Sequence, residues 1–242
     1  MRIAVLTTET AHHAHFVRSI YAHGRTVVAF VEKPVLARYD TWHPFEDERN
    51  AYECQTWFNG VLPRIKDFAA AEDLTDLSLA ADQVRAFSPN LVIAFGTRIL
   101  RGEMLCLHPD TFNLHGGDPH TYRGSDTHLW AIWHRQFDEL KTCIHRLTQV
   151  VDGGEIVTVE PIPLFKNMRL HQLRAVNTEV CIKLVERVIA DLTASGSIKT
   201  LGEKGNGRLY FQMPAVLKDD CVRRFERYTG TLSDGLRGTA ES

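Results

Sequence analysis

The sequence predicts an α/β protein with a Rossmann-like, mostly parallel sheet flanked by helices. Continuous apolar runs at residues 3–6, 26–31 and 91–95 are typical of strands buried on both faces of such a sheet. Between the first two runs, apolar residues recur at helical spacing from Phe16 to Tyr21, and Gly24 follows where a helix ends. Strand, helix and strand within about 30 residues form a βαβ unit, which is nearly always right-handed.

The remaining elements are predicted from apolar spacing and from capping residues. Residues 33–75 have no clean period, and they are predicted to form a long loop with one helix near 48–59. The other predicted elements are a helix from an N-cap at Thr75 or Asp76 to Phe87, a strand at 111–115, a helix over 129–137 capped by Ser125 or Asp126, strands at 140–148 and 155–163, a helix over 172–192, a short segment at 210–211 and a helix near 216–228. Residues 230–242 are predicted to be frayed. We therefore expect a main domain at 1–195 and a short C-terminal extension at 196–242, formed by a hairpin and a helix.

Composition narrows the classes of partner. The chain has 242 residues, of which 44% are apolar and 24% charged, and Lys plus Arg (28) nearly balances Asp plus Glu (30). A net charge of −2 argues against a nucleic-acid partner, which requires a basic surface. No apolar run approaches the roughly 18 residues of a membrane span, and the five cysteines are widely spaced without a C-x-x-C motif. We expect a cytoplasmic protein with reduced thiols and no membrane partner.

The candidate chemistry begins at the strand Thr111–His115. Alternate residues of a strand share a face, so Asn113 and His115 point to one side while Phe112 and Leu114 point into the core. These two polar side chains therefore lie at the end of a strand, where open α/β sheets bind their ligands.

An acidic residue follows downstream in a tight turn. Asp152 precedes Gly153 and Gly154, and an aspartate there can reach back to a histidine, fix its tautomer and raise its pKa. Asn, His and Asp together suit acyl transfer to an amine, because the first two donate to an oxyanion and the third helps to move a proton. Spacing alone leaves open a satisfied polar pair and an ordinary turn, and it does not select the group transferred.

Several motifs in combination resemble the folate-dependent formyltransferases. These motifs are Asn113-Leu114-His115, Tyr122-Arg123-Gly124, Thr142-x-x-His145 and Asp152-Gly153-Gly154-Glu155-Ile156-Val157. The family includes glycinamide ribonucleotide transformylase, methionyl-tRNA formyltransferase and sugar N-formyltransferases. The resemblance spans residues 1–30 and 75–195, and it implies the formyltransferase fold, with a catalytic domain at 1–195.

The resemblance also implies roles for individual residues. The co-substrate would be N10-formyltetrahydrofolate, and Asn113 and His115 would stabilise the tetrahedral intermediate on its formyl carbon. Asp152 would pair with His115 and lie near N10 and the incoming amine. The segment 94–100 resembles the folate loop of the glycinamide enzyme, and Arg98, Ile99 and Leu100 within it would line the pterin pocket.

The acceptor side is predicted from weaker signals. His12 and His13 occupy the positions of a phosphate-binding loop in the glycinamide enzyme, and with Tyr122 and Arg123 they are predicted to bind substrate. Histidines that face solvent in the first turn of a helix are the alternative for His12 and His13. We expect no metal site, because no acidic or cysteine partner has a fitting spacing and the chemistry needs none.

The loop and the chain length favour a sugar N-formyltransferase. The substrate would be a nucleotide-linked amino sugar of the kind used in lipopolysaccharide O-antigen biosynthesis, and the resemblance suggests a homodimer. The alternatives are a formyltransferase for another small amine, such as hydroxyornithine or glycinamide ribonucleotide, and a non-catalytic protein that binds folate or nucleotide. A nicotinamide dehydrogenase is disfavoured, because the first loop, Thr7–Ala11, lacks G-x-G-x-x-G.

Overall fold

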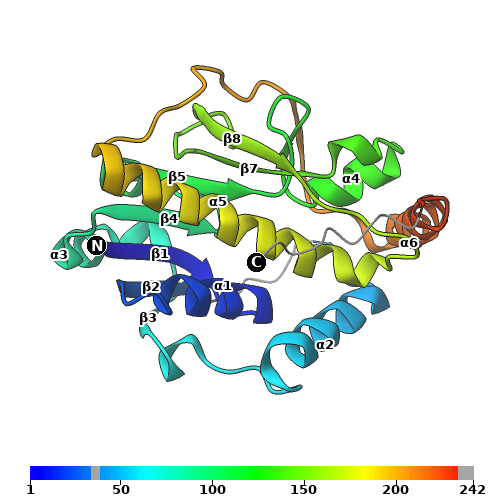
Figure 1. The fold of residues 1–242 in the computed structure, drawn as a ribbon, viewed down its shortest axis with the longest axis horizontal. Helices are drawn as coiled ribbons and strands as arrows, with labels where there is room; N and C mark the ends of the chain where they lie inside the picture. Colours follow the sequence, from blue (N-terminus) through cyan, green and yellow to red (C-terminus); the bar gives the residue numbers. More distant parts are fainter. Residues whose placement is uncertain (34–38, 234–242) are drawn as a thin grey trace, which may run out of the picture.

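The computed structural model describes residues 1–33 and 39–233. Within them, a sheet has the strand order β3-β2-β1-β4-β5-β7-β8 (Figure 1). Its strands are β1 (Arg2–Thr8), β2 (Thr26–Glu32), β3 (Ala70–Leu74), β4 (Leu91–Phe95), β5 (Thr111–His115), β7 (Lys141–Arg146) and β8 (Ile156–Pro161). The strands from β3 to β5 in that order run parallel, and β7 and β8 are antiparallel to their neighbours. The predicted mostly parallel sheet is confirmed.

Helices cover both faces of this sheet. The α-helices are α1 (Ala11–Tyr21), α2 (Pro44–Phe58), α3 (Ala81–Phe87), α4 (Thr127–Trp133), α5 (Leu173–Ser195) and α6 (Ala215–Gly230). The short 3₁₀ helices are η1 (Ile65–Asp67), η2 (Leu77–Leu79), η3 (Gly102–Cys106), η4 (Phe137–Glu139) and η5 (Leu170–Gln172). Helices α1 and α5 lie side by side on one face, where they share a core with β1, β2 and β4 (Figure 1). Helix α3 and η2 pack on the opposite face.

A second core lies at one end of the sheet, where α2, α4 and α6 gather (Figure 1). Phe225 of α6 is fully buried there, together with residues of α4 and the start of α5. Beside it, β6 (Tyr122–Gly124) pairs in parallel with β9 (Arg208–Tyr210). The described part of residues 196–233 thus forms one strand and one helix, so the predicted hairpin is wrong. The strand pairs with a distant partner and extends the main domain.

Other elements differ from the prediction in their bounds. Helix α2 begins at Pro44 rather than near 48, and β3 lies inside the predicted long loop, of which residues 34–38 are outside the described residues. The helix expected from Thr75 or Asp76 is divided, because Asp76 caps the short η2 by accepting from the Ser78 N–H and α3 begins only at Ala81.

Two further elements also have different ends. Helix α4 spans Thr127–Trp133, and the residues expected to extend it, up to 137, lie beyond its end. Helix α6 continues to Gly230, where fraying was expected, and residues 234–242 lie outside the described part. None of the helices in the described ranges is both long and apolar enough to cross a bilayer.

Candidate active site

A cavity of about 610 Å³ lies at the carboxyl ends of β1, β4 and β5. Its wall includes the first turn of α1, the loop after β4, the end of β5, the turn at Asp152 and the segment after β9. This is the edge at which open α/β sheets bind ligands. The volume lies within the range usual for small-molecule sites, roughly 300–1,000 Å³.

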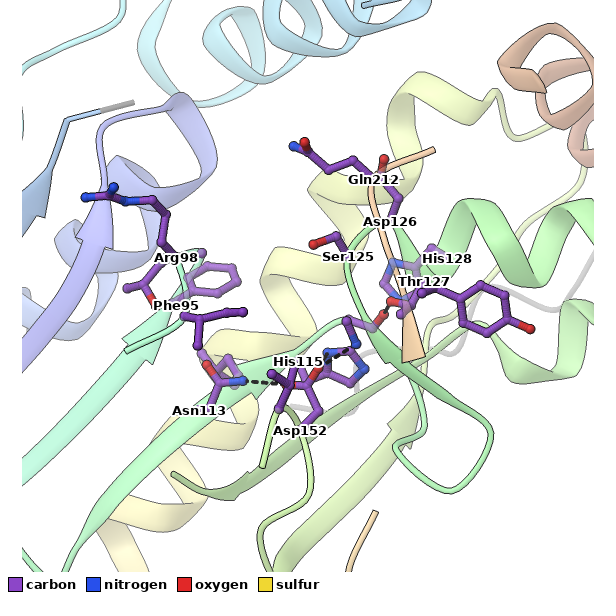
Figure 2. Close-up of a pocket in the computed structure, with 18 of the residues that line it drawn as sticks. Phe95, Arg98, Asn113, His115, Ser125, Asp126, Thr127, His128, Asp152 and Gln212 are labelled. Carbon is purple, nitrogen blue, oxygen red and sulfur yellow. Dashed lines mark hydrogen bonds and ion pairs between the residues drawn. The ribbon is translucent and has the colours of Figure 1, made fainter. Parts of the chain in front are cut away.

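Asp152 is the centre of the polar cluster on one side of the cavity (Figure 2). Its Oδ1 accepts from Asn113 Nδ2 at 3.1 Å, and its Oδ2 accepts from the Gly124 backbone N–H at 2.7 Å. Oδ2 also lies 3.3 Å from His115 Nδ1. Burial raises the pKa of this carboxyl, but His115, His145 and the Gly124 N–H outweigh it and lower the pKa to about 2. Asp152 is therefore ionised at neutral pH.

Two histidines face this one carboxylate. His115 Nε2 lies 2.8 Å from the Tyr122 carbonyl oxygen, and His145 Nδ1 lies 2.9 Å from the Arg146 carbonyl oxygen. A carbonyl oxygen only accepts, so each of these nitrogens carries a proton and donates. The other nitrogen of each ring faces Asp152, at 3.3 Å in both cases.

The protonation of His115 follows from its burial. Its side chain is 4% exposed, and burial lowers its pKa even though Asp152 acts in the opposite direction. A neutral His115 with its proton on Nε2 presents a lone pair at Nδ1 to the carboxylate. The His115–Asp152 pair thus carries one negative charge and has room for one incoming proton between Nδ1 and Oδ2.

The backbone fixes Asp152 in place. Its φ of 47° lies in the left-handed region, which is uncommon for a residue other than glycine. At Gly154 a Cβ would lie 1.8 Å from the Arg146 carbonyl oxygen, so no other residue fits without moving β7. The close approach of Gly154 to β7 therefore holds the Asp152 carboxylate beside His145.

The predicted folate loop forms the neighbouring wall. Ile99 is 57% exposed and Leu100 is buried, and both line the cavity together with Arg98. The Arg98 backbone N–H and guanidinium both donate to the buried carboxylate of Glu32, at 3.2 and 2.6 Å. Because Glu32 also accepts from the Leu77 N–H, it ties the loop to β2 and η2. The charge of Arg98 is thus used to hold the loop.

His12 and His13 lie in the same cavity wall and are buried, so they do not face solvent. Their ring centroids are 3.8 Å apart. Burial lowers the pKa of His12 well below its usual value and that of His13 to about 3, with Arg174 adding to both shifts. Both rings are neutral at pH 7. His13 Nε2 is fully buried without a hydrogen-bond partner.

Tyr122 and Arg123 lie outside the lining of this cavity. The Tyr122 hydroxyl contacts His134 Nδ1 at 2.9 Å in a second hollow of about 380 Å³. Arg123 Nε donates to the Gly207 carbonyl at 2.7 Å and clips the C-terminal segment to β6. Their substrate-binding role stays a prediction.

Sequence reasoning left several cavity residues without a role. His145 appeared only as part of a motif, although it pairs across the sheet with Asn113 and alternation along β7 aims it at the same face. The others had no local signal, because distant segments bring them to the wall: Arg49, Asp126, His128 and Arg174. Within the described ranges, no group of three or more His, Cys, Asp or Glu side chains is arranged to hold a metal ion.

Solved structures with this fold include several formyltransferases. Glycinamide ribonucleotide transformylase 1 from Symbiobacterium toebii has a TM-score of 0.59 and 17% identity, over 86% of this chain and 94% of that one. A sugar N-formyltransferase from a Shewanella species has a TM-score of 0.58 and 14% identity, over 97% and 89% of the two chains. The formyltransferase PseJ from Anoxybacillus kamchatkensis, solved with a formylated UDP-sugar and tetrahydrofolate, has a TM-score of 0.50 and 17% identity over 97% and 93%.

No protein-family model matches the chain. At identities of 14–17% these likenesses establish the architecture rather than the activity. The predicted fold is thereby confirmed: this chain has the α/β fold of the formyltransferases.

Proposed function

We propose that this protein is an enzyme that transfers the formyl group of N10-formyltetrahydrofolate to the amino group of a nucleotide-linked amino sugar. The observation that carries the proposal is the meeting of Asn113, His115 and Asp152 on the wall of one large cavity. The fold supports it, since sugar N-formyltransferases share this architecture and one of the similar structures holds a UDP-sugar and tetrahydrofolate.

The reaction transfers one formyl group to the amine and one proton to N10. The amine nitrogen attacks the formyl carbon, an N–C bond forms, and the bond between that carbon and N10 breaks. One proton leaves the amine, and one reaches N10 of the departing tetrahydrofolate. The His115–Asp152 pair, with one vacant proton position in a buried site, can take up the first proton and deliver the second.

Proton uptake would also release a hydrogen-bond donor. In this structure Asn113 Nδ2 donates to Asp152 and approaches His145 Nε2 at 3.2 Å, so it is not free for an oxyanion. A proton between His115 and Asp152 weakens the pull of the carboxylate on this amide. The amide can then donate to the negative oxygen of the tetrahedral intermediate as that oxygen forms.

The walls of the cavity suggest where the two substrates bind. The loop 96–100 would receive the pterin through backbone groups and the apolar side chains of Ile99 and Leu100. The acceptor would enter between α1, α2 and the end of β9 with the segment that follows it, where Tyr210, Phe211 and Gln212 line the cavity. The amine then meets the formyl carbon beside Asp152.

A panel of acceptors tests the proposal. The protein is incubated with formyl-labelled N10-formyltetrahydrofolate and, separately, with dTDP-, GDP- and UDP-linked amino sugars, glycinamide ribonucleotide and hydroxyornithine. We expect labelled formamide on at least one nucleotide-linked sugar. Transfer only to glycinamide ribonucleotide or hydroxyornithine would contradict the sugar acceptor, and stabilisation by folate without transfer to any amine would indicate a binding protein.

The proposal includes a homodimer that acts in the cytoplasm and supplies a formylated sugar for lipopolysaccharide O-antigen. The similarity to sugar N-formyltransferases supports the formylated sugar as the product. Light scattering on the purified protein measures the assembly state, and a monomer at micromolar concentration would contradict the dimer.

A further inference from the structure

Arg49 differs from the other arginines of the cavity wall because its guanidinium has no partner in the protein. Arg49 lies in α2 and lines the cavity. It has no hydrogen bond or ion pair with any described residue, and its Nε is fully buried without a partner. Its one protein contact of note is the ring of Phe45, with the centroid 5.5 Å from Cζ. A buried donor without an acceptor is costly and calls for an explanation.

The other arginines that line the cavity in the described part of the chain are both neutralised. Arg174 donates to both carboxylate oxygens of Glu53 at 2.6 Å, and Arg98 donates to Glu32 at 2.6 Å. These pairs fix the wall. Arg49 has no such pair, so its charge is available to something inside the cavity.

The carboxylates nearest to Arg49 are already used. Glu46 receives Lys218 Nζ at 2.8 Å, and Glu53 receives Arg174. Asp126 accepts from the Met213 N–H at 2.8 Å, and its burial raises its pKa. Burial and the charge of Arg174 lower the pKa of Arg49 to about 10, which leaves it charged at neutral pH. Glu46, Glu53 and Asp126 raise the pKa of Arg49 through space, but none of them forms a hydrogen bond or an ion pair with its guanidinium.

A second unpartnered atom lines the same cavity. His13 Nδ1 lies 3.0 Å from the hydroxyls of Thr8 and Thr10, while its Nε2 has no partner. If a threonine hydroxyl donates to Nδ1, the proton of the neutral ring is on Nε2, which then is a free donor. The cavity therefore contains a cation and a neutral imidazole nitrogen, both without a hydrogen-bond partner from the protein.

We propose that Arg49 binds an anionic group of the acceptor substrate, a phosphate or a carboxylate, and so selects acceptors that carry one. This inference rests on the proposed function, because it assigns the binding residue to the acceptor of that reaction. A guanidinium matches the oxygen pairs of both groups in a bidentate manner. The anion would supply the partner that the folded chain does not.

The first test observes the Arg49 side chain by NMR and does not depend on formyl transfer. The arginine side chains are labelled with ¹⁵N, and the Nε signal of Arg49 is identified by its loss in Arg49→Lys. We expect this signal to shift saturably on addition of inorganic pyrophosphate or of acetate, and not of sodium chloride at equal ionic strength. Saturation by pyrophosphate alone identifies a phosphate site, and saturation by acetate alone identifies a carboxylate site. No saturable shift with either anion, or an equal shift with chloride, overturns the proposal.

The second test uses kinetics with matched variants. Arg49→Met should raise the KM for the formyl acceptor about 10- to 100-fold, the usual range for loss of a charged hydrogen bond. The kcat and the KM for the folate donor should stay within a few-fold of wild type. Arg85→Met, at an ion-paired arginine outside the cavity lining, is the control and should change none of these. An unchanged acceptor KM in Arg49→Met overturns the proposal, whereas a wild-type protein without formyl transfer refutes the proposed function and leaves the titration to decide on Arg49.

The thermal stability of two variants distinguishes a binding role of Arg49 from a structural role. Arg49→Met removes a charge without a protein partner, so its Tm should be at least as high as that of wild type. Arg174→Met leaves Glu53, which is fully buried, without its partner, and its Tm should fall by several degrees. If Arg49→Met lost as much stability as Arg174→Met, Arg49 would be part of the scaffold and the proposal would fail.

Discussion

Two groups of polar residues on the cavity wall differ in their hydrogen bonding. One is the Asp152 cluster, formed by Asn113, His115, His145 and Asp152, and the other is the pair of Arg49 and His13. Around Asp152, Asn113 donates to the carboxylate, and His115 and His145 each contact it as well as a backbone carbonyl. In the other group, two buried nitrogens have no partner, one on Arg49 and one on His13. A cluster whose members all contact one another is held in one geometry before any ligand arrives, as bond-making chemistry requires. The unpaired nitrogens of Arg49 and His13 keep their hydrogen-bonding capacity for a ligand. Under the proposed function, the Asp152 cluster is the reaction centre, and Arg49 and His13 belong to the part of the wall that binds the acceptor.

The largest effect on turnover should come from substitutions in the Asp152 cluster. Asp152→Asn removes the charge that both histidines face, and kcat for formyl transfer should fall about 10³-fold or more. Asn113→Ala or His115→Ala should lower kcat by about 10²–10³, as for the loss of an oxyanion donor. Initial rates at saturating substrates measure these changes. Asp82→Asn is the matched control, because Asp82 is paired with Arg85 and lies outside the cavity lining. Unchanged turnover in the Asp152, Asn113 and His115 variants would remove the cluster from the mechanism.

The next largest effect should come from a steric change in the turn that carries Asp152. Gly154→Ala places a Cβ 1.8 Å from the Arg146 carbonyl oxygen and forces the Asp152 turn away from β7. We expect a loss of about 3 kcal/mol or more in the free energy of unfolding, measured in urea. Gly24→Ala is the control, because Gly24 has φ of 69° and open space around its Cβ position. It should cost only about 1 kcal/mol, the conformational part alone. Equal losses in the two variants would mean that the turn is free to move.

The pH dependence of stability should show His13 and Asp152 titrating in different pH ranges. His13 is neutral in the folded protein, with its pKa lowered from 6.5 to about 3, so its contribution is complete above 6.5 and is lost as the pH falls toward 3. Within that window one histidine gives a slope of about 1.4 kcal/mol per pH unit. The Asp152 pKa is lowered from 3.8 to about 2, so its contribution of about 2 kcal/mol is complete above 3.8 and is lost as the pH falls toward 2.

Urea unfolding of two variants from pH 7 to pH 2 checks this separation. His13→Gln should flatten the curve between pH 6.5 and 3, and Asp152→Asn should flatten it below pH 3.8. If both variants gave curves parallel to that of wild type, neither group would carry the pH dependence assigned to it.

The smallest effect should come from the loop that follows β4. Arg98→Met removes the ion pair with Glu32 but leaves the Arg98 backbone N–H bonded to that carboxylate. Because the arginine side chain is 43% exposed, the KM for the folate donor should rise only about threefold. A rise of a hundredfold would show that the guanidinium itself binds the donor.

Much of the fold could be predicted because local signals and burial agree. The strand Thr111–His115 has the predicted bounds, and alternation along it brings Asn113 and His115 to one cavity wall. Strand β3 (Ala70–Leu74) was missed, because Ala-Ala-Glu-Asp-Leu contains no β-branched or aromatic residue and pairs on one side only. The β6–β9 pairing was missed because it joins segments more than 80 residues apart, as in Tyr122 opposite Arg208.

The site was predicted to a similar extent and for similar reasons. The approach of Asp152 to His115 agrees with the family resemblance, while the catalytic roles of these residues stay predictions. Arg49 could not be found from the sequence, because α2 carries a mixture of charges and only the folded chain shows which of them lack a partner. Missing partners are a property of the assembled wall.

The strand after residue 195 has a consequence for engineering. Gly205 packs against the Asp152 carbonyl oxygen, and Tyr210, Phe211 and Gln212 close one side of the cavity. A chimera that exchanged the tail at Ser195 would therefore also exchange part of the substrate enclosure. Acceptor preference should travel with such a graft, and a truncation at the same point should leave the reaction centre open to bulk water.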